Sequence, residues 1–154
     1  MAVFHLSDLS KNLPGSHVIG VAAFSHLSTD TRNLAAGDLF VALVGPNFDG
    51  HEFIAQAQNQ GACAALVSTE IDTDLPLIVV PDTRIALGQL AAIKRQSLNG
   101  QFVSVTGSSG KTTVKEMLQK VLFQAGEVEV TQGNFNNDIG VPLTLLRLEK
   151  QHEF

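Results

Sequence analysis

The sequence predicts an α/β fold in two parts, a small N-terminal α/β domain and the beginning of a second α/β domain. Apolar residues make up 44% of the chain and charged residues only 16%, below the usual share of about a quarter, so we expect a buried sheet. Short apolar runs alternate with segments of helical periodicity. A glycine-rich turn also lies between one such run and an amphipathic segment. We place the domains at residues 1–81 and 82–154.

The first half of the chain alternates helix and strand signals. The apolar run 38–44 is nearly continuous, as in a strand that is buried on both faces, and Gly45-Pro46 ends it. Gly61 stands where a helix would stop. The amphipathic segment after Pro81-Asp82 predicts a long helix that bridges the domains. In chain order we expect helix 4–12, strand 17–24, a polar loop 25–33, strand 38–44, helix 50–60, strands 64–67 and 77–80, and helix 81–98.

The second half predicts a βαβ unit and little more. Strand 101–106, turn 107–110, helix 111–125 and strand 128–131 make up that unit, and a helix begins near Asp138. Two strands form only a marginal sheet, and the apolar segment 141–148 has little left to pack on. We therefore expect this sequence to be an N-terminal piece of a longer protein.

Charge and cysteine content exclude several classes of protein. Ten basic and fifteen acidic residues give a formal charge of −5, unlike a general nucleic-acid binder with its basic face. The single cysteine, Cys63, can form no internal disulfide, which fits a reducing compartment. No apolar run approaches the roughly 20 residues needed to span a bilayer, and no secretory signal is visible. The expected location is the cytoplasm.

A candidate phosphate-binding loop extends from Thr106 to Thr113, with the sequence Thr-Gly-Ser-Ser-Gly-Lys-Thr-Thr. A strand before it and a helix after it are the context that such a loop requires, because backbone N–H groups and the helix N-terminus then face the phosphates. Lys111 would reach the β- and γ-phosphates of ATP, and Thr112 would hold Mg²⁺ through its hydroxyl. The match covers the Gly-Lys-Thr end of the Walker A pattern only, since Val105 occupies the place of the earlier glycine. The alternative is a glycine-rich turn with a surface lysine.

A second polar loop, residues 131–140, follows the expected strand 128–131. Ligands of doubly wound sheets sit at the carboxyl ends of the strands, so this loop would stand beside the phosphate loop. Its asparagines, among them Asn134 and Asn137, could orient a phosphate or a carboxyl group. The alternative is an asparagine cap for the helix that begins near Asp138.

These motifs together resemble the Mur ligase family. The resemblance rests on runs 106–117 and 131–146 in the second half and on three segments of the first half. Those segments are Ser28-Thr-Asp-Thr-Arg32, Gly37-Asp-Leu-Phe-Val-Ala-Leu43 and Asn47-Phe-Asp-Gly-His-Glu-Phe-Ile54. The family has three domains, so the resemblance implies a first domain that holds a uridine diphosphate and the opening of a central ATP-binding domain with a P-loop.

The resemblance implies an ATP-dependent ligase of peptidoglycan precursor synthesis. Within the family the sequence looks most like the members that add D-alanyl-D-alanine to UDP-N-acetylmuramoyl-tripeptide through an acyl phosphate, with ATP and Mg²⁺ as cofactors. We expect a monomer, inactive as this stretch alone, with Lys111 as catalytic residue and Thr112 as metal ligand. The implied ATP-binding residues are Gly107, Ser108, Ser109, Gly110, Lys111, Thr112 and Thr113. The implied substrate-binding residues are Ser28, Thr29, Asp30, Thr31, Arg32, Asp49, Gly50, His51, Asn134 and Asn137.

Alternatives stay open at this point. Asp30 and Arg32 could form an ion pair that stabilises the loop without contacting a ligand. His51 could likewise cap the helix that begins near it and contact no ligand. The related ligase that adds the diamino acid usually carries asparagine where Ser109 stands. A nucleotide-binding short form without catalysis is a further possibility. A generic P-loop kinase is disfavoured, because none of the four arginines lies near the loop in sequence.

Overall fold

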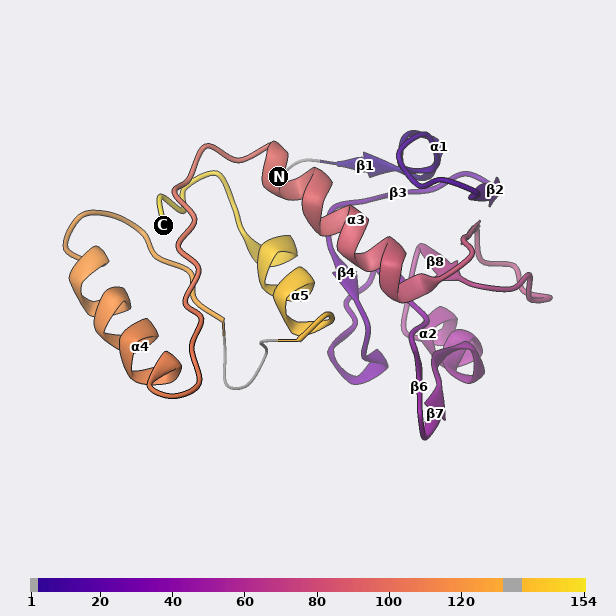
Figure 1. Ribbon diagram of the computed structural model, residues 1–154. Coiled ribbons are helices and arrows are strands. Elements are labelled where there is room, and N and C mark those ends of the chain that lie inside the picture. The colour runs from indigo at the N-terminus through magenta and orange to yellow at the C-terminus, as the bar shows by residue number, and fades with distance from the viewer. Residues whose placement is uncertain (1–2, 132–136) are drawn as a thin grey trace. The chain divides into compact units, whose positions relative to one another are not determined.

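The computed structural model describes residues 3–131 and 137–154 and divides into two compact units. The division falls between Leu90 and Ala91, inside the long helix α3 (Thr83–Gln96). The fold class is α/β, as expected from the alternation of apolar runs and amphipathic segments (Figure 1).

The first unit is built on a mixed five-stranded sheet with strand order β2-β9-β8-β5-β4. The parallel strands are β4 (Leu27–Ser28), β5 (Leu39–Val41), β8 (Ala64–Val67) and β9 (Leu77–Val79). Strand β2 (His17–Ile19) pairs with β9 in the antiparallel direction. Every residue of β5, β8 and β9 is buried, which confirms the prediction of strands buried on both faces.

Two helices of the first unit form within the predicted helices 4–12 and 50–60. They are α1 (Leu6–Ser10) and α2 (Ile54–Asn59), the latter preceded by the 3₁₀ turn η2 (Gly50–Phe53). The segment 25–33, predicted as a polar loop, instead contains β4 and the 3₁₀ turn η1 (Thr31–Asn33). Ile54 and Ala57 of α2 pack into a core with Phe40 and Val67 of the sheet. Because η2 runs directly into α2, the helix predicted over 50–60 begins with a tighter turn.

The prediction of one continuous strand over 17–24 is wrong. It is two short strands, β2 and β3 (Ala23–Phe24), which belong to different sheets. Gly20 between them has φ +83°, a conformation that glycine adopts freely and that ends extended pairing. Strand β3 pairs with β1 (Phe4–His5) instead of joining the main sheet.

A two-stranded hairpin stands beside the main sheet. Strands β6 (Val44–Gly45) and β7 (Phe48–Asp49) pair antiparallel. Residues 44–49, which we call the hairpin 44–49, connect the end of β5 to η2. The apolar run predicted as one strand over 38–44 therefore ends earlier, at Val41, and its last residue belongs to the hairpin.

After the end of α3, the helices in the described part of the second unit are α4 (Lys111–Leu122) and α5 (Gly140–Arg147). The strands predicted over 101–106 and 128–131 are not formed, so the described part of this unit contains no complete βαβ motif. The pairing between extended segments that the structure describes in this unit involves the chain end. The amide of Gln101 donates to Glu153, that of Glu129 donates to Phe154, and Glu127 forms an isolated parallel bridge with His152.

The missing strands have a physical cause. A strand is stabilised by its neighbours, and two strands alone are marginal. Helix α4 accordingly has no buried residue. Its apolar side chains Val114, Met117 and Val121 are exposed, and Leu118 and Leu122 are half-buried. Within residues 3–131 and 137–154, no helix combines the length and the apolar character needed to cross a bilayer.

Candidate functional site

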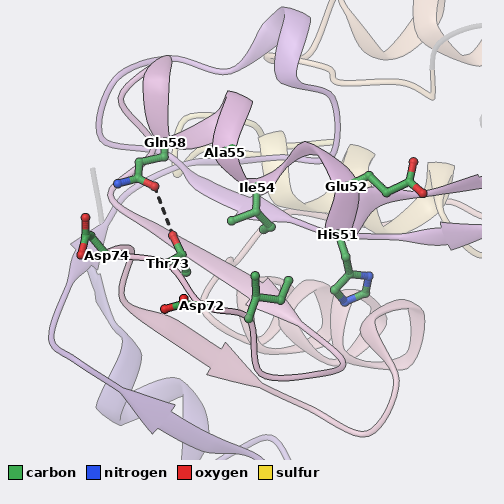
Figure 2. Close-up of a pocket in the computed structure, with 9 residues that line it drawn as sticks. His51, Glu52, Ile54, Ala55, Gln58, Asp72, Thr73 and Asp74 are labelled. Atoms are coloured by element: carbon green, nitrogen blue, oxygen red, sulfur yellow. Dashed lines mark hydrogen bonds between the residues drawn. The ribbon is translucent and has the colours of Figure 1, made fainter.

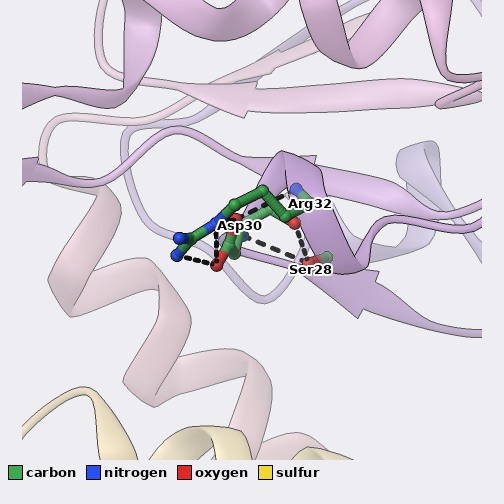
Figure 3. A network of polar contacts seen from close by, with 3 residues as sticks. All are labelled: Ser28, Asp30 and Arg32. Carbon is green, nitrogen blue, oxygen red and sulfur yellow. Dashed lines mark hydrogen bonds and ion pairs between the residues drawn. The ribbon is translucent and has the colours of Figure 1, made fainter.

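A polar cluster follows strand β4 in the first unit (Figure 3). Asp30 precedes η1, and its Oδ1 accepts the backbone N–H of Arg32 at 3.0 Å, which satisfies a donor at the start of that turn. The guanidinium of Arg32 donates two hydrogen bonds to the same carboxylate, with Nε 2.9 Å from Oδ1 and Nη2 2.7 Å from Oδ2. The Ser28 hydroxyl donates to the carbonyl of Asp30 and accepts its amide. Thr31 within this turn is buried.

The ion pair of the cluster leaves part of the Arg32 guanidinium open to solvent. The hydrogen bond from the Arg32 side chain, joined by that from its backbone, holds the pKa of the Asp30 carboxyl below its usual range. The same pairing raises the pKa of Arg32. The Arg32 side chain is 85% exposed, so a guanidinium fixed along one edge still presents further N–H donors to solvent. Pairing with Asp30 and binding a phosphate are therefore compatible.

Asp49, Gly50 and His51 form a second polar group, at the end of the hairpin 44–49. The Asp49 carboxylate accepts the backbone N–H of His51 at 2.9 Å and also bonds the ring Nδ1 of that residue. Both bonds lower the pKa of Asp49, with the backbone bond as the larger cause. Asp49, rather than His51, is thus the cap of η2. The His51 Nε2 lies 2.9 Å from the backbone nitrogen of Ser68, a partner that the sequence analysis did not find.

Both groups lie at one edge of the sheet. Ser28 is the last residue of β4, and Leu43, which bonds the amide of Gly50, follows β5. Ser68 follows β8 directly. Because β4, β5 and β8 are parallel neighbours, the fold brings the predicted uridine-nucleotide residues to adjacent carboxyl ends, where ligands of such sheets bind.

A hollow of about 400 Å³ lies beside this edge, between η2, α2 and the loop before β9 (Figure 2). Its lining includes the carboxylates Glu52, Asp72 and Asp74, and Thr73 donates a hydrogen bond to Gln58 across it. No lysine or arginine lines the hollow. An acidic lining repels a diphosphate, so this hollow does not suit the phosphate end of a nucleotide.

The phosphate-loop candidate lies in the second unit. Gly107 and Gly110 have φ of +152° and +76°, which only glycine adopts readily. Gly110 directly precedes α4, and the first helical bond of α4 is that from the Val114 amide to the Gly110 carbonyl. The amides of residues 111–113 are therefore not used by the helix. Such donors at a helix N-terminus suit a phosphate.

Lys111 and Thr112 stand at the start of α4. The Nζ of Lys111 donates to the carbonyl oxygen of Gly107 at 2.5 Å, so the ammonium lies over the loop. Thr112 is exposed in the first turn. Its hydroxyl suits a Mg²⁺ ion that arrives with ATP, because Mg²⁺ takes few protein ligands and keeps phosphate and water oxygens. Among the described residues, no group of three or more His, Cys, Asp or Glu could hold a metal ion by itself.

The second loop of this unit is described only in part. Asn134 lies outside the described residues. The Oδ1 of Asn137 accepts the amides of Ile139 at 3.3 Å and Gly140 at 2.8 Å. The Asn137 side chain therefore satisfies amides at the start of α5, the kind of contact that the alternative interpretation expected, although the N-cap residue itself is Ile139. Helix α5 begins at Gly140, near the predicted Asp138.

Lys115 is a residue of this unit that the sequence analysis missed. Its Nζ donates to the carbonyl of Thr131 at 2.8 Å, where the second loop begins. The signal was present, since Lys115 follows Lys111 by four residues and so lies on the same face of α4.

Comparisons with known proteins agree with this architecture. Residues 23–95 match the model described as Mur ligase family, catalytic domain, and residues 105–154 match the Mur ligase middle domain. The UDP-N-acetylmuramoyl-tripeptide–D-alanyl-D-alanine ligase of Escherichia coli (strain K12) is 50% identical over 97% of this chain and 33% of its own length. That of Haemophilus influenzae is 52% identical over 83% of this chain and 29% of its own length.

Solved structures give the same result. MurF from Acinetobacter baumannii superposes with a TM-score of 0.84 at 40% identity, over 96% of this chain and 33% of that one. MurF ligase from Thermotoga maritima, solved in complex with ADP, gives 0.75 at 37% identity, over 83% of this chain and 30% of that one. The chain spans about a third of the length of the curated relatives it matches. With matches to two Mur ligase models that together extend over most of its length, this chain belongs to the Mur ligase family.

Proposed function

We propose that this chain provides the uridine-nucleotide-binding and ATP-binding parts of a cytoplasmic, monomeric ligase that adds D-alanyl-D-alanine to UDP-N-acetylmuramoyl-tripeptide. The sequence identity to relatives named for that activity supports the substrate assignment. The loop before α4 carries the proposal, because two positive-φ glycines, unused amides and Lys111 converge there. The ADP complex of the Thermotoga maritima relative supports nucleotide binding.

In the proposed reaction, the terminal carboxylate of the tripeptide attacks the γ-phosphorus of ATP. An acyl phosphate forms and ADP leaves. The amine of D-alanyl-D-alanine then attacks the acyl carbon, forms the amide and releases inorganic phosphate and a proton. Phosphoryl transfer depends mainly on positioning and charge neutralisation. Mg²⁺ would neutralise phosphate charge when bound.

This chain's own residues have separate roles in the proposal. The backbone of residues 107–113 cradles the phosphates, and Lys111 exchanges the Gly107 carbonyl for phosphate oxygens. Thr112 supplies one oxygen for Mg²⁺. Arg32, held by Asp30, meets the diphosphate of the uridine nucleotide. Asn137 and Asn134 are assigned to the muramoyl substrate. The Asn137 carboxamide oxygen accepts an amide at the start of α5, which fixes the direction of its remaining NH₂ donor.

The test is calorimetry on the purified chain, with Mg-ADP and UDP-N-acetylmuramoyl-tripeptide titrated separately. Calorimetry suits this protein because it has no Trp and no Tyr. We expect one site for each ligand. A folded chain that binds neither ligand would overturn the proposal. A chain that binds only Mg-ADP would overturn the proposed uridine-nucleotide site.

A second assay addresses the choice of acceptor. ATP-dependent phosphate release is measured on the protein as the cell makes it, with the tripeptide substrate plus D-alanyl-D-alanine or with the dipeptide substrate plus a diamino acid. We expect release with the first pair. Release with the second pair alone would assign the related diamino-acid-adding activity instead.

A further inference from the structure

His51 is tied into the fold through both nitrogens of its ring. Nδ1 bonds the Asp49 carboxylate, and Nε2 lies 2.9 Å from the backbone nitrogen and 3.1 Å from the hydroxyl of Ser68. The side chain is only 11% exposed. A ring with both nitrogens engaged has no donor left for a phosphate.

The partners also fix where the ring proton sits. A backbone N–H can only donate, so Nε2 of His51 must accept from Ser68 and carry no proton. The proton of a neutral imidazole then resides on Nδ1, where it donates to the Asp49 carboxylate. Hydrogen-bond partners commonly select the tautomer in this way.

The ring joins two segments that meet at the carboxyl edge of the sheet. Asp49 ends the hairpin 44–49, whereas Ser68 follows β8. Gly50 fixes the same hairpin from the other side, since its amide donates to Leu43 at 2.8 Å. A Cβ at Gly50 would lie 2.7 Å from both the nitrogen and the oxygen of Leu43. The hairpin is therefore attached to the ends of β5 and β8 at once.

We propose that His51 is a neutral, Nδ1-protonated positioning residue that holds the hairpin 44–49 against the end of β8, and not a phosphate ligand. This inference rests on the proposed function in one respect: it assumes that the hairpin 44–49 is part of the uridine-nucleotide site. It reassigns His51 from the direct contact that the family resemblance implied to an action through Asp49 and Ser68.

The direct test is a long-range ¹H–¹⁵N correlation spectrum of the histidine rings in the purified chain at neutral pH. A spectrum of His51→Gln assigns the signals of His51 among the five histidines. We expect an unprotonated Nε2 and a protonated Nδ1, the reverse of the tautomer that exposed neutral histidines prefer. A protonated Nε2, or averaging between the two nitrogens, would overturn the proposal. This result does not depend on any ligand.

The second test is calorimetry with the uridine substrate on two variants. His51→Ala is expected to weaken binding about five- to tenfold, the effect of one lost hydrogen bond that positions the site. His51→Gln, whose amide oxygen can still accept the Ser68 N–H, should recover most of that affinity. Equal losses in both variants would indicate a direct ligand and contradict the proposal, and so would unchanged affinity in His51→Ala. Mg-ADP affinity reports on α4 and should be the same in all three proteins.

The outcomes separate this inference from the proposed function. If His51→Ala does not fold, the ring spectrum of the unaltered chain and the affinity of His51→Gln for the uridine substrate still test the positioning role of His51. If the unaltered chain has the expected tautomer and binds no uridine substrate, the proposed function fails whereas the structural role of His51 stands.

Discussion

The ammonium of Lys111 donates a hydrogen bond to the carbonyl oxygen of Gly107, four residues earlier. This contact places the Lys111 ammonium over the turn formed by Gly107 and Gly110, whose φ angles are positive. A lysine held there needs little movement to meet a phosphate cradled by the same turn. The relationship between these two residues is the basis of the first prediction.

Replacing Lys111 with alanine should weaken Mg-ADP binding about 10- to 100-fold, the effect of losing a charged hydrogen-bond donor. Binding of the uridine substrate should not change. Lys120→Ala is the matched control, because Lys120 is an exposed lysine in the last turn of the same helix. Calorimetry with each ligand checks the prediction, and equal Mg-ADP affinity in the two variants would contradict it.

Arg32→Ala should weaken binding of the uridine substrate by about tenfold or more and leave Mg-ADP binding unchanged. The reason is the loss of an exposed guanidinium that Asp30 holds in place. Arg32→Lys should not restore full affinity, since an ammonium cannot repeat the planar pairing with Asp30. Parallel losses for both ligands would indicate misfolding and would be visible by circular dichroism.

Acid should remove the contribution of the Asp30–Arg32 pair to stability. The folded-state pKa of Asp30 is lowered, so this contribution is present above the unfolded value of about 3.9 and is lost as pH falls through the lower folded value. The pair is exposed to solvent, which screens its charges, so its contribution to stability should be small. Denaturant unfolding between about pH 2 and pH 5 should show a flatter acid limb in Asp30→Asn and in Arg32→Ala. The double variant should resemble either single one, and additive effects would show that the pair is not coupled.

Gly50→Ala should lower the free energy of unfolding by about 1–3 kcal/mol, because the added Cβ meets the backbone of Leu43. Gly88→Ala, within α3, is the control, because nothing lies within 4 Å of its added Cβ. That change should stabilise the protein by about 0.4–1 kcal/mol. Urea unfolding followed by circular dichroism measures both. A Gly50→Ala variant as stable as the parent would show that the hairpin 44–49 can move away from Leu43.

Lys115→Met should loosen the chain at Thr131, since it removes a charged donor to that carbonyl. The neighbouring amide of Glu129, which donates to Phe154, should exchange with deuterium several-fold faster. Lys120→Met on the same helix should leave that exchange rate unchanged. Amide exchange followed by mass spectrometry distinguishes the two variants.

Local sequence determined much of this protein. The apolar runs that became β5, β8 and β9 are short and continuous, as in strands that are buried on both faces. The turn before α4 followed from Gly107 and Gly110, because only glycine adopts those backbone angles readily. The residues Ser28–Arg32 and 106–113 also pointed to the family that the comparisons identified. Each of these features depends on neighbours in the chain.

Tertiary structure decided the features that depend on distant partners. Pairing split the run 17–24 between two sheets, and within the described residues 101–106 and 128–131 form no ladder. The positioning role proposed for His51 rests on a contact of this kind, between its Nε2 and the backbone amide of Ser68, 17 residues away. A ladder hydrogen bond or a ring tautomer is set by the atom on the other side of it. That partner atom is brought into place only when the sheet has formed, so residue spacing along the chain does not predict which atom it will be.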